Sequence, residues 1–291
     1  MAIGNNTAAE PYTNGVNGHP QIDYDAVVIG ARFGGVRMLY ELRKRGISAK
    51  PFEAGSGVRG TWYWNRYPGS RTDSESWVYI LTFLEEIDME WDWKERFPTQ
   101  PDVEQYLNRI TDHLDLRKDI ELNTRVTAAH CDATNNLWKV TTSKGNSYTC
   151  TYLITATGPL ATLLKPPFPG LDSFKGEWYQ TGLWPKHKVD WKRVGIVGTG
   201  ATAVQVIPIV AHNAKTLTVF QRTPNYVLPA RNHPLTEDQM TEIKRNYAKI
   251  FKQARGQLFG ITYLMLRALL RTWLGDGWIP IYLRDFCRYA H

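Results

Sequence analysis

YDAVVIGARFGG, residues Tyr24–Gly35, is the most informative segment of this 291-residue sequence. Tyr24–Ile29 is a short apolar run rich in β-branched residues, which is typical of a buried strand. A glycine turn follows it. Val36–Arg45 then predicts a helix, and Ala49–Glu53 predicts a second strand. A strand, a glycine turn, a helix and a strand within about 30 residues predict a dinucleotide-binding unit.

The same pattern occurs again further along the chain. Arg193–Val197 predicts a strand, a Gly198-x-Gly200 turn follows it, and Ala203–Ala211 and Leu217–Phe220 predict the next helix and strand. Between the two units, Pro101–Leu116 predicts an amphipathic helix, Leu137–Thr142 and Ser147–Tyr152 a hairpin, and Leu153–Ala156 a buried strand. The sequence therefore predicts an α/β fold with two Rossmann-like dinucleotide-binding domains, incomplete at the C-terminus, and a helical tail.

The expected domain limits follow from these patterns. They are a disordered leader over 1–21, a first dinucleotide-binding domain over 22–165, a second over 166–234 and a helical segment over 235–291. The leader has neither a basic start nor an apolar stretch, so it does not resemble a signal peptide. The apolar stretch Leu258–Leu274 contains Arg267 and Arg271, which favours a packing helix over membrane insertion.

Composition excludes several other classes of protein. The net charge is +7, but the basic residues are scattered, so we expect phosphate-bearing ligands and no nucleic acid. The three cysteines fit neither a disulfide framework nor a metal site. We therefore expect a cytoplasmic protein that binds no metal and does not associate with membranes.

The first turn departs from the usual dinucleotide pattern at its centre. Glycines at the first and last positions of G-x-G-x-x-G allow the tight turn and close helix packing, and the middle glycine lets the backbone approach a pyrophosphate. Gly30 and Gly35 are in place, but Arg32 occupies the middle position. Glu53 stands where the pattern expects an acid for a ribose hydroxyl, although it could instead be a solvated strand end.

Four motifs together resemble the Baeyer–Villiger monooxygenases, the class B flavoprotein monooxygenases. They are the segment Glu53–Ser76, the run Phe174-x-Gly176-x-x-x-Gln180-x-x-x-Trp184-Pro185, the turn Gly198–Gln205, and Gln221-Arg222-Thr223-Pro224. The likeness extends from Tyr24 to about Pro234. It identifies the chain as a member of this family that looks truncated at the C-terminus and partly degenerate.

The resemblance implies a reaction and a set of site residues. NADPH would reduce FAD, and O2 would then oxidise a ketone, such as a polyketide or terpenoid intermediate of secondary metabolism, to an ester or lactone. The first domain would bind FAD and the second NADPH. The residues implied for FAD are Gly30, Gly35, Glu53, Thr61, Trp62 and Asp73. Those implied for NADPH are Gly198, Gly200, Thr202, Gln205, Arg222 and Thr223, and the catalytic positions are Asp73 and Gln180. An Arg after the second strand favours NADPH over NADH, because a guanidinium grips a 2′-phosphate.

Several departures from the family open a second possibility. Arg32 and Arg59 replace glycines near the flavin, so we expect weak FAD binding, and Gln180 replaces a histidine. The arginine that relatives pair with the equivalent of Asp73 has no identified counterpart. The charge could come from Arg66, Arg71 or Arg231. The alternative is a noncatalytic protein that retains at most NADPH binding.

Overall fold

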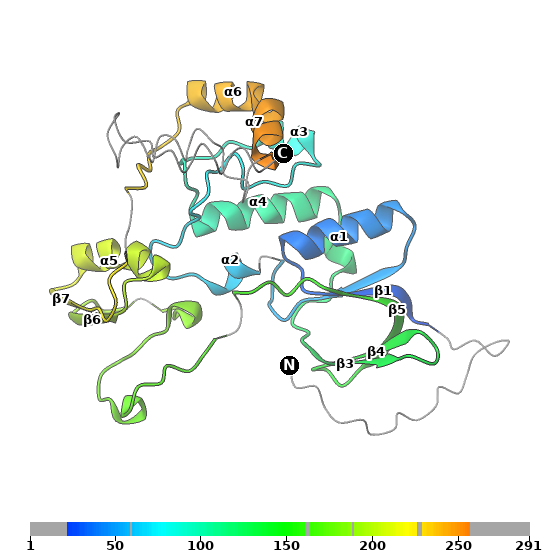
Figure 1. Ribbon diagram of the computed structural model, residues 1–291, viewed down its shortest axis with the longest axis horizontal. Helices are drawn as coiled ribbons and strands as arrows, with labels where there is room; N and C mark the ends of the chain where they lie inside the picture. The colour runs from blue at the N-terminus through cyan, green and yellow to red at the C-terminus, as the bar shows by residue number, and fades with distance from the viewer. Residues whose placement is uncertain (1–21, 59, 161–162, 188, 226–228, 257–291) are drawn as a thin grey trace, which may run out of the picture. The chain divides into compact units, whose positions relative to one another are not determined.

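A computed structural model describes residues 22–58, 60–160, 163–187, 189–225 and 229–256, which form two compact units (Figure 1). The first unit combines residues up to Asn65 with Glu104–Trp178, and the second combines Arg66–Val103 with residues from Tyr179 onward. Each unit is therefore built from two separate stretches of chain. The continuous limits 22–165, 166–234 and 235–291 stay predictions.

A mixed five-stranded sheet forms the centre of the first unit, in the order β2-β1-β5-β4-β3. Strands β2, β1 and β5 are parallel, and β5, β4 and β3 are antiparallel. The strands are β1 Tyr24–Ile29, β2 Ala49–Phe52, β3 Val126–Asp132, β4 Leu137–Thr142 and β5 Ser147–Thr155. The predicted hairpin strand Ser147–Tyr152 and the predicted buried strand from Leu153 are thus one strand, because the same nine residues pair with β4 first and with β1 further on.

Strand β1 is buried on both faces, which explains its unbroken apolar sequence. Val27 packs with residues of β2, β4 and β5 on one face, and Ala26 and Val28 pack with Leu42 of α1 on the other. Helix α1 spans Phe33–Lys44, so it begins three residues earlier than the predicted Val36. Beside it on the same side of the sheet runs α4, Gln100–His113 (Figure 1).

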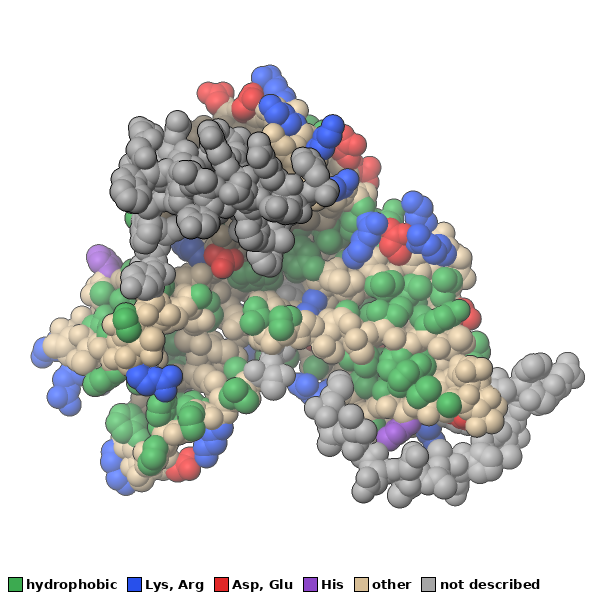
Figure 2. Space-filling view, in the orientation of Figure 1, with side chains coloured by type: hydrophobic (Ala, Val, Ile, Leu, Met, Phe, Trp, Pro, Cys, Tyr) green, Lys and Arg blue, Asp and Glu red, His purple; other side chains and the backbone are tan. Residues whose placement is uncertain are grey.

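The second unit contains a parallel pair of strands and a helix that connects them. The pair is β6, Arg193–Val197, and β7, Thr216–Phe220, with α5, Ala201–Asn213, between them. Val197 is 63% exposed and Phe220 is 57% exposed. Apolar side chains are visible on the surface of this part of the molecule in Figure 2. The predicted second unit of strand, helix and strand is confirmed.

Short helices complete the second unit. They are α3 Glu85–Glu90, α6 Glu237–Arg245 and α7 Tyr247–Arg255. Thr236 begins α6 with a capping box, in which its side chain and that of Gln239 exchange hydrogen bonds with the backbone. The predicted helical tail therefore holds as far as the structure describes it.

The expectations about membranes and metal ions can be compared with the structure only over the described residues. Within the ranges that the structure describes, no helix has the length and apolar character needed to cross a membrane, and no group of acidic, histidine or cysteine side chains could hold a metal ion. The predicted leader 1–21, the apolar stretch Leu258–Leu274, Arg59 and Cys287 lie outside the described residues.

Candidate nucleotide-binding sites

The first glycine turn packs α1 directly against the sheet. Gly30 has a φ of +101°, and a β-carbon there would lie 2.7 Å from the carbonyl oxygen of Ala156. A β-carbon on Gly35 would lie only 2.0 Å from the carbonyl oxygen of Gly30. The backbone itself thus requires glycine at the first and last positions, independently of any ligand.

Glu53 braces this turn from inside. The residue is 4% exposed, and its two carboxylate oxygens accept hydrogen bonds of 2.9 Å from the backbone N–H groups of Ala31 and Gly55. Glu53 is therefore not a solvated strand end. Each oxygen keeps a second lone pair, so the predicted contact with a ribose hydroxyl stays compatible with these bonds.

The side chain of Arg32 lies across the space in front of the turn. A β-carbon on Gly60 would lie 2.1 Å from Arg32 Cγ, and one on Gly158 would lie 2.8 Å from Arg32 Nη1. The Nη1 atom is buried, and the described residues offer it no hydrogen-bond partner. Burial lowers the pKa of the guanidinium, while the negative charge of Glu53 opposes that shift. Arg32 therefore fills the cradle that Gly60 and Gly158 leave open.

The second turn has a similar backbone conformation, but the described side chains leave the space around its glycines open. Arg32 and Gly200 each precede the first residue of a helix, with φ/ψ of −96°/−170° and −73°/−177°. Both conformations are open to any residue. Apart from the glycine itself and its two neighbours in the chain, no described residue has an atom within 4 Å of a β-carbon built on Gly198 or Gly200. The middle position of such a turn therefore needs glycine only for a ligand, and the second turn has kept it.

The loop after β7 is fastened to the second turn. Gln221 donates a 2.8 Å hydrogen bond to Thr199 Oγ1, and Asn225 donates a 3.1 Å hydrogen bond to the carbonyl oxygen of Thr199. Arg222 and Thr223 lie between these two amides and are exposed. Neither Gln221 nor Asn225 was predicted as a site residue, although an amide on each side of Arg222-Thr223 is a signal that the sequence contains.

Asp73 is exposed on a loop whose two ends are held by backbone hydrogen bonds. The N–H of Thr72 donates to the carbonyl oxygen of Pro98 at 3.0 Å, and the N–H of Ser76 donates to that of Arg96 at 2.7 Å. Buried Glu75 forms a 2.8 Å ion pair with Arg96. The Asp73 carboxylate is therefore exposed to solvent on a loop whose ends are held in place.

The other predicted residues lie at a turn, a helix start or a helix interior. Trp62 is buried in the short helix α2, Thr61–Trp64, which begins directly after Gly60. Thr202 is half-buried at the second position of α5. Gln180 precedes a 3-10 turn beside stacked Trp184 and Trp191 rings, whose centroids are 5.8 Å apart.

Two residues have protein partners that the sequence did not suggest. The side-chain amide of Gln205 is bonded to Tyr67 and to the backbone of Arg71. The guanidinium of Arg71 forms a 2.8 Å ion pair with Glu95, so its charge is already balanced.

Comparison with known proteins places these turns in a family. The family described as pyridine nucleotide-disulphide oxidoreductase matches residues 27–257. A 2-oxo-Δ3-4,5,5-trimethylcyclopentenylacetyl-CoA monooxygenase of Pseudomonas putida is 45% identical over 79% of this chain and 44% of its own length. A Baeyer–Villiger monooxygenase of Pseudooceanicola batsensis is 44% identical over 81% of this chain and 44% of its own length.

A solved structure shares the fold as well. The crystal structure of the OTEMO complex with FAD and NADP superposes with a TM-score of 0.77 at 44% identity, covering 81% of this chain and 46% of that one. The chain therefore spans less than half the length of each of these three relatives.

Proposed function

We propose that this chain takes part in NADPH-dependent oxidation of a ketone to an ester or lactone. The premise is that it belongs to the pyridine nucleotide-disulphide oxidoreductase family and, within it, to the Baeyer–Villiger monooxygenases. The observation that carries the proposal is the open second turn followed by Arg222. The substrate class is a small ketone, of the kind found among polyketide or terpenoid intermediates.

The second turn suits NADPH. Backbone N–H groups at the start of α5 and the positive end of its dipole favour a pyrophosphate over Gly198 and Gly200, with Thr202 beside them. The loop fastened by Gln221 and Asn225 presents Arg222 and Thr223 for the 2′-phosphate that distinguishes NADPH from NADH.

Replacing Arg222 tests this assignment. We expect Arg222→Ala to reduce the preference for NADPH over NADH about tenfold or more, because a charge-assisted contact with phosphate contributes about 1.5–3 kcal/mol. Arg193→Ala is the matched control, because Arg193 is an exposed arginine at the opposite end of β6. Titration of both nucleotides by isothermal calorimetry measures the ratio, and an unchanged ratio in Arg222→Ala would remove the assignment.

The first and last glycines of the first turn suit FAD, but the residue at its middle position, Arg32, does not. Gly30, Gly35 and Glu53 form the tight turn that a flavin dinucleotide requires, with Thr61 and Trp62 nearby in the chain. As it lies, however, the Arg32 side chain fills the pyrophosphate approach. FAD fits here only after this side chain turns out, which is favoured because Nη1 has no hydrogen-bond partner among the described residues.

The proposed reaction consumes NADPH, one proton, O2 and the ketone. One oxygen atom enters the product beside the carbonyl, and the other leaves as water. Bound FAD would supply the step between the two-electron donor and oxygen. The proposed part of this chain is to hold the two nucleotides and to place Asp73 and Gln180 at the reacting end.

An assay of product mass separates this proposal from its alternative. The protein is incubated with FAD, NADPH and a panel of cyclic ketones, and the products are analysed by mass spectrometry. A product heavier by one oxygen atom supports oxygenation. NADPH binding without such a product would support the second candidate, a noncatalytic nucleotide-binding protein. That candidate is favoured by the filled cradle at Arg32.

A further inference from the structure

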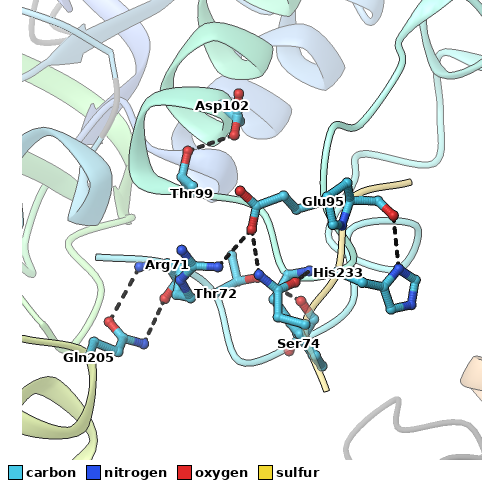
Figure 3. A network of polar contacts seen from close by, with 11 residues as sticks. Arg71, Thr72, Ser74, Glu95, Thr99, Asp102, Gln205 and His233 are labelled. Atoms are coloured by element: carbon cyan, nitrogen blue, oxygen red, sulfur yellow. Dashed lines mark hydrogen bonds and ion pairs between the residues drawn. The ribbon is translucent and has the colours of Figure 1, made fainter. Parts of the chain in front are cut away.

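Gln205 lies on α5, the helix that begins at the second turn, but its side-chain amide is bonded to other protein groups. Its Oε1 accepts a 2.9 Å hydrogen bond from the hydroxyl of Tyr67 and a 3.3 Å bond from the N–H of Arg71. Its Nε2 donates a 3.1 Å bond to the carbonyl oxygen of Arg71. Three bonds therefore join this one amide to the segment that leads into the Asp73 loop. Figure 3 shows those that reach Arg71.

The backbone at this contact is also close. A β-carbon on Gly69 would lie 2.4 Å from the carbonyl oxygen of Gln205, and Gly69 has a φ of +80°. The segment can therefore lie against α5 only because this position is glycine. Tyr67, Gly69 and Arg71 thus contact the helix at alternate positions along the segment.

The far side of the same segment is held by a second set of contacts. Arg71 pairs with Glu95, and the side-chain amide of Asn232 donates to the same carboxylate. Asn232 Oδ1 in turn accepts a 3.0 Å bond from the N–H of Phe97. Arg71 is therefore fixed through its backbone by Gln205 and through its side chain by Glu95, two residues before Asp73.

We propose that Gln205 is a positioning residue that ties the Asp73 loop to the helix of the NADPH turn, and that it does not contact the nucleotide. The proposal rests on the proposed function, which assigns the Asp73 loop to the reacting end and the second turn to NADPH. It replaces the role in NADPH binding that the motif implies for Gln205. The chemical reason is that both lone pairs of Oε1 and one of the two N–H groups of Nε2 are already bonded to protein groups.

Hydrogen exchange and nucleotide titration together test this role. In Gln205→Ala, we expect residues 67–76 to exchange about tenfold faster or more, because the loop loses three hydrogen bonds. The Kd for NADP⁺ should stay within about twofold, since no nucleotide contact is removed. Tyr67→Phe removes one of the three bonds and leaves Gln205 in place, so it should show the same change at about fivefold.

Gln221→Ala is the matched control. Gln221 is another glutamine of the second unit, but its amide bonds to Thr199 in the turn itself. We expect weaker NADP⁺ binding and unchanged exchange over 67–76 in this variant. The two glutamines should therefore give opposite patterns.

Two results would overturn the proposal. One is unchanged exchange over 67–76 with weaker NADP⁺ binding in Gln205→Ala, which would make Gln205 a nucleotide ligand. The other is faster exchange spread evenly over α5 and β6, which would make it a support of the whole unit. Failure of the unaltered protein to bind NADP⁺ would contradict the proposed function alone, because exchange over 67–76 is measured without nucleotide.

Discussion

Arg32→Gly is expected to bind FAD about ten to a hundred times more tightly than the unaltered protein. The substitution removes the side chain that fills the cradle between Gly60 and Gly158 and leaves the backbone conformation accessible. The gain comes from restored approach of the pyrophosphate to the backbone N–H groups, where hydrogen bonds to a charged group contribute about 1.5–3 kcal/mol each. Quenching of flavin fluorescence measures the Kd.

The reciprocal substitution controls for this effect. Gly200 has nearly the same backbone angles as Arg32 and open space around it, so Gly200→Arg should fold normally and lose NADP⁺ binding. Weaker FAD binding by Arg32→Gly would contradict the expectation and would make Arg32 a cationic partner of the phosphates.

Gly35→Ala is expected to destabilise the first unit by about 3 kcal/mol, the upper end of the cost of overpacking a close contact. The added β-carbon would lie 2.0 Å from the carbonyl oxygen of Gly30, a backbone atom that can move only with β1 or α1. A drop of about 6–12 °C in melting temperature is expected for a chain of this size. Thermal unfolding followed by circular dichroism measures it.

The neighbouring glycine provides the control. A β-carbon on Gly34 would lie 4.0 Å from its nearest neighbour, the β-carbon of Ala156, and Gly34 is exposed in the first turn of α1. Gly34→Ala should therefore leave stability unchanged or raise it by about 0.4–1 kcal/mol, since it restricts the unfolded chain. Equal melting temperatures for the two variants would show that α1 is not held against β1 through Gly35.

Both dinucleotide units were predictable because their physics is local. An apolar run buried on both faces predicts β1, and the glycines at 30 and 35 are required by contacts within a few residues. Strand β3 and the continuity of β5 were missed. Pairing of Val126–Asp132 with β4 depends on partners that its own half-exposed sequence does not specify.

Contacts between side chains that are far apart in the sequence could not be predicted from it. Motif position implied a nucleotide role for Gln205, which stays a prediction, but it gave no sign that the amide is bonded to residues 134 and 138 positions earlier. Arg32 shows the opposite case. The sequence marked it as an obstacle at a ligand position, and the structure adds where its side chain lies, over Gly60 and Gly158.

Native mass spectrometry of Arg32→Gly with FAD and NADP⁺ present together tests most directly whether each glycine turn takes its own nucleotide. We expect a complex that holds one FAD and one NADP⁺. Adding Gly200→Arg to the same chain should remove NADP⁺ and leave FAD bound, because that substitution changes only the second turn. Loss of FAD with Gly200→Arg, or mutual displacement of the two nucleotides in Arg32→Gly, would contradict the assignment of separate sites.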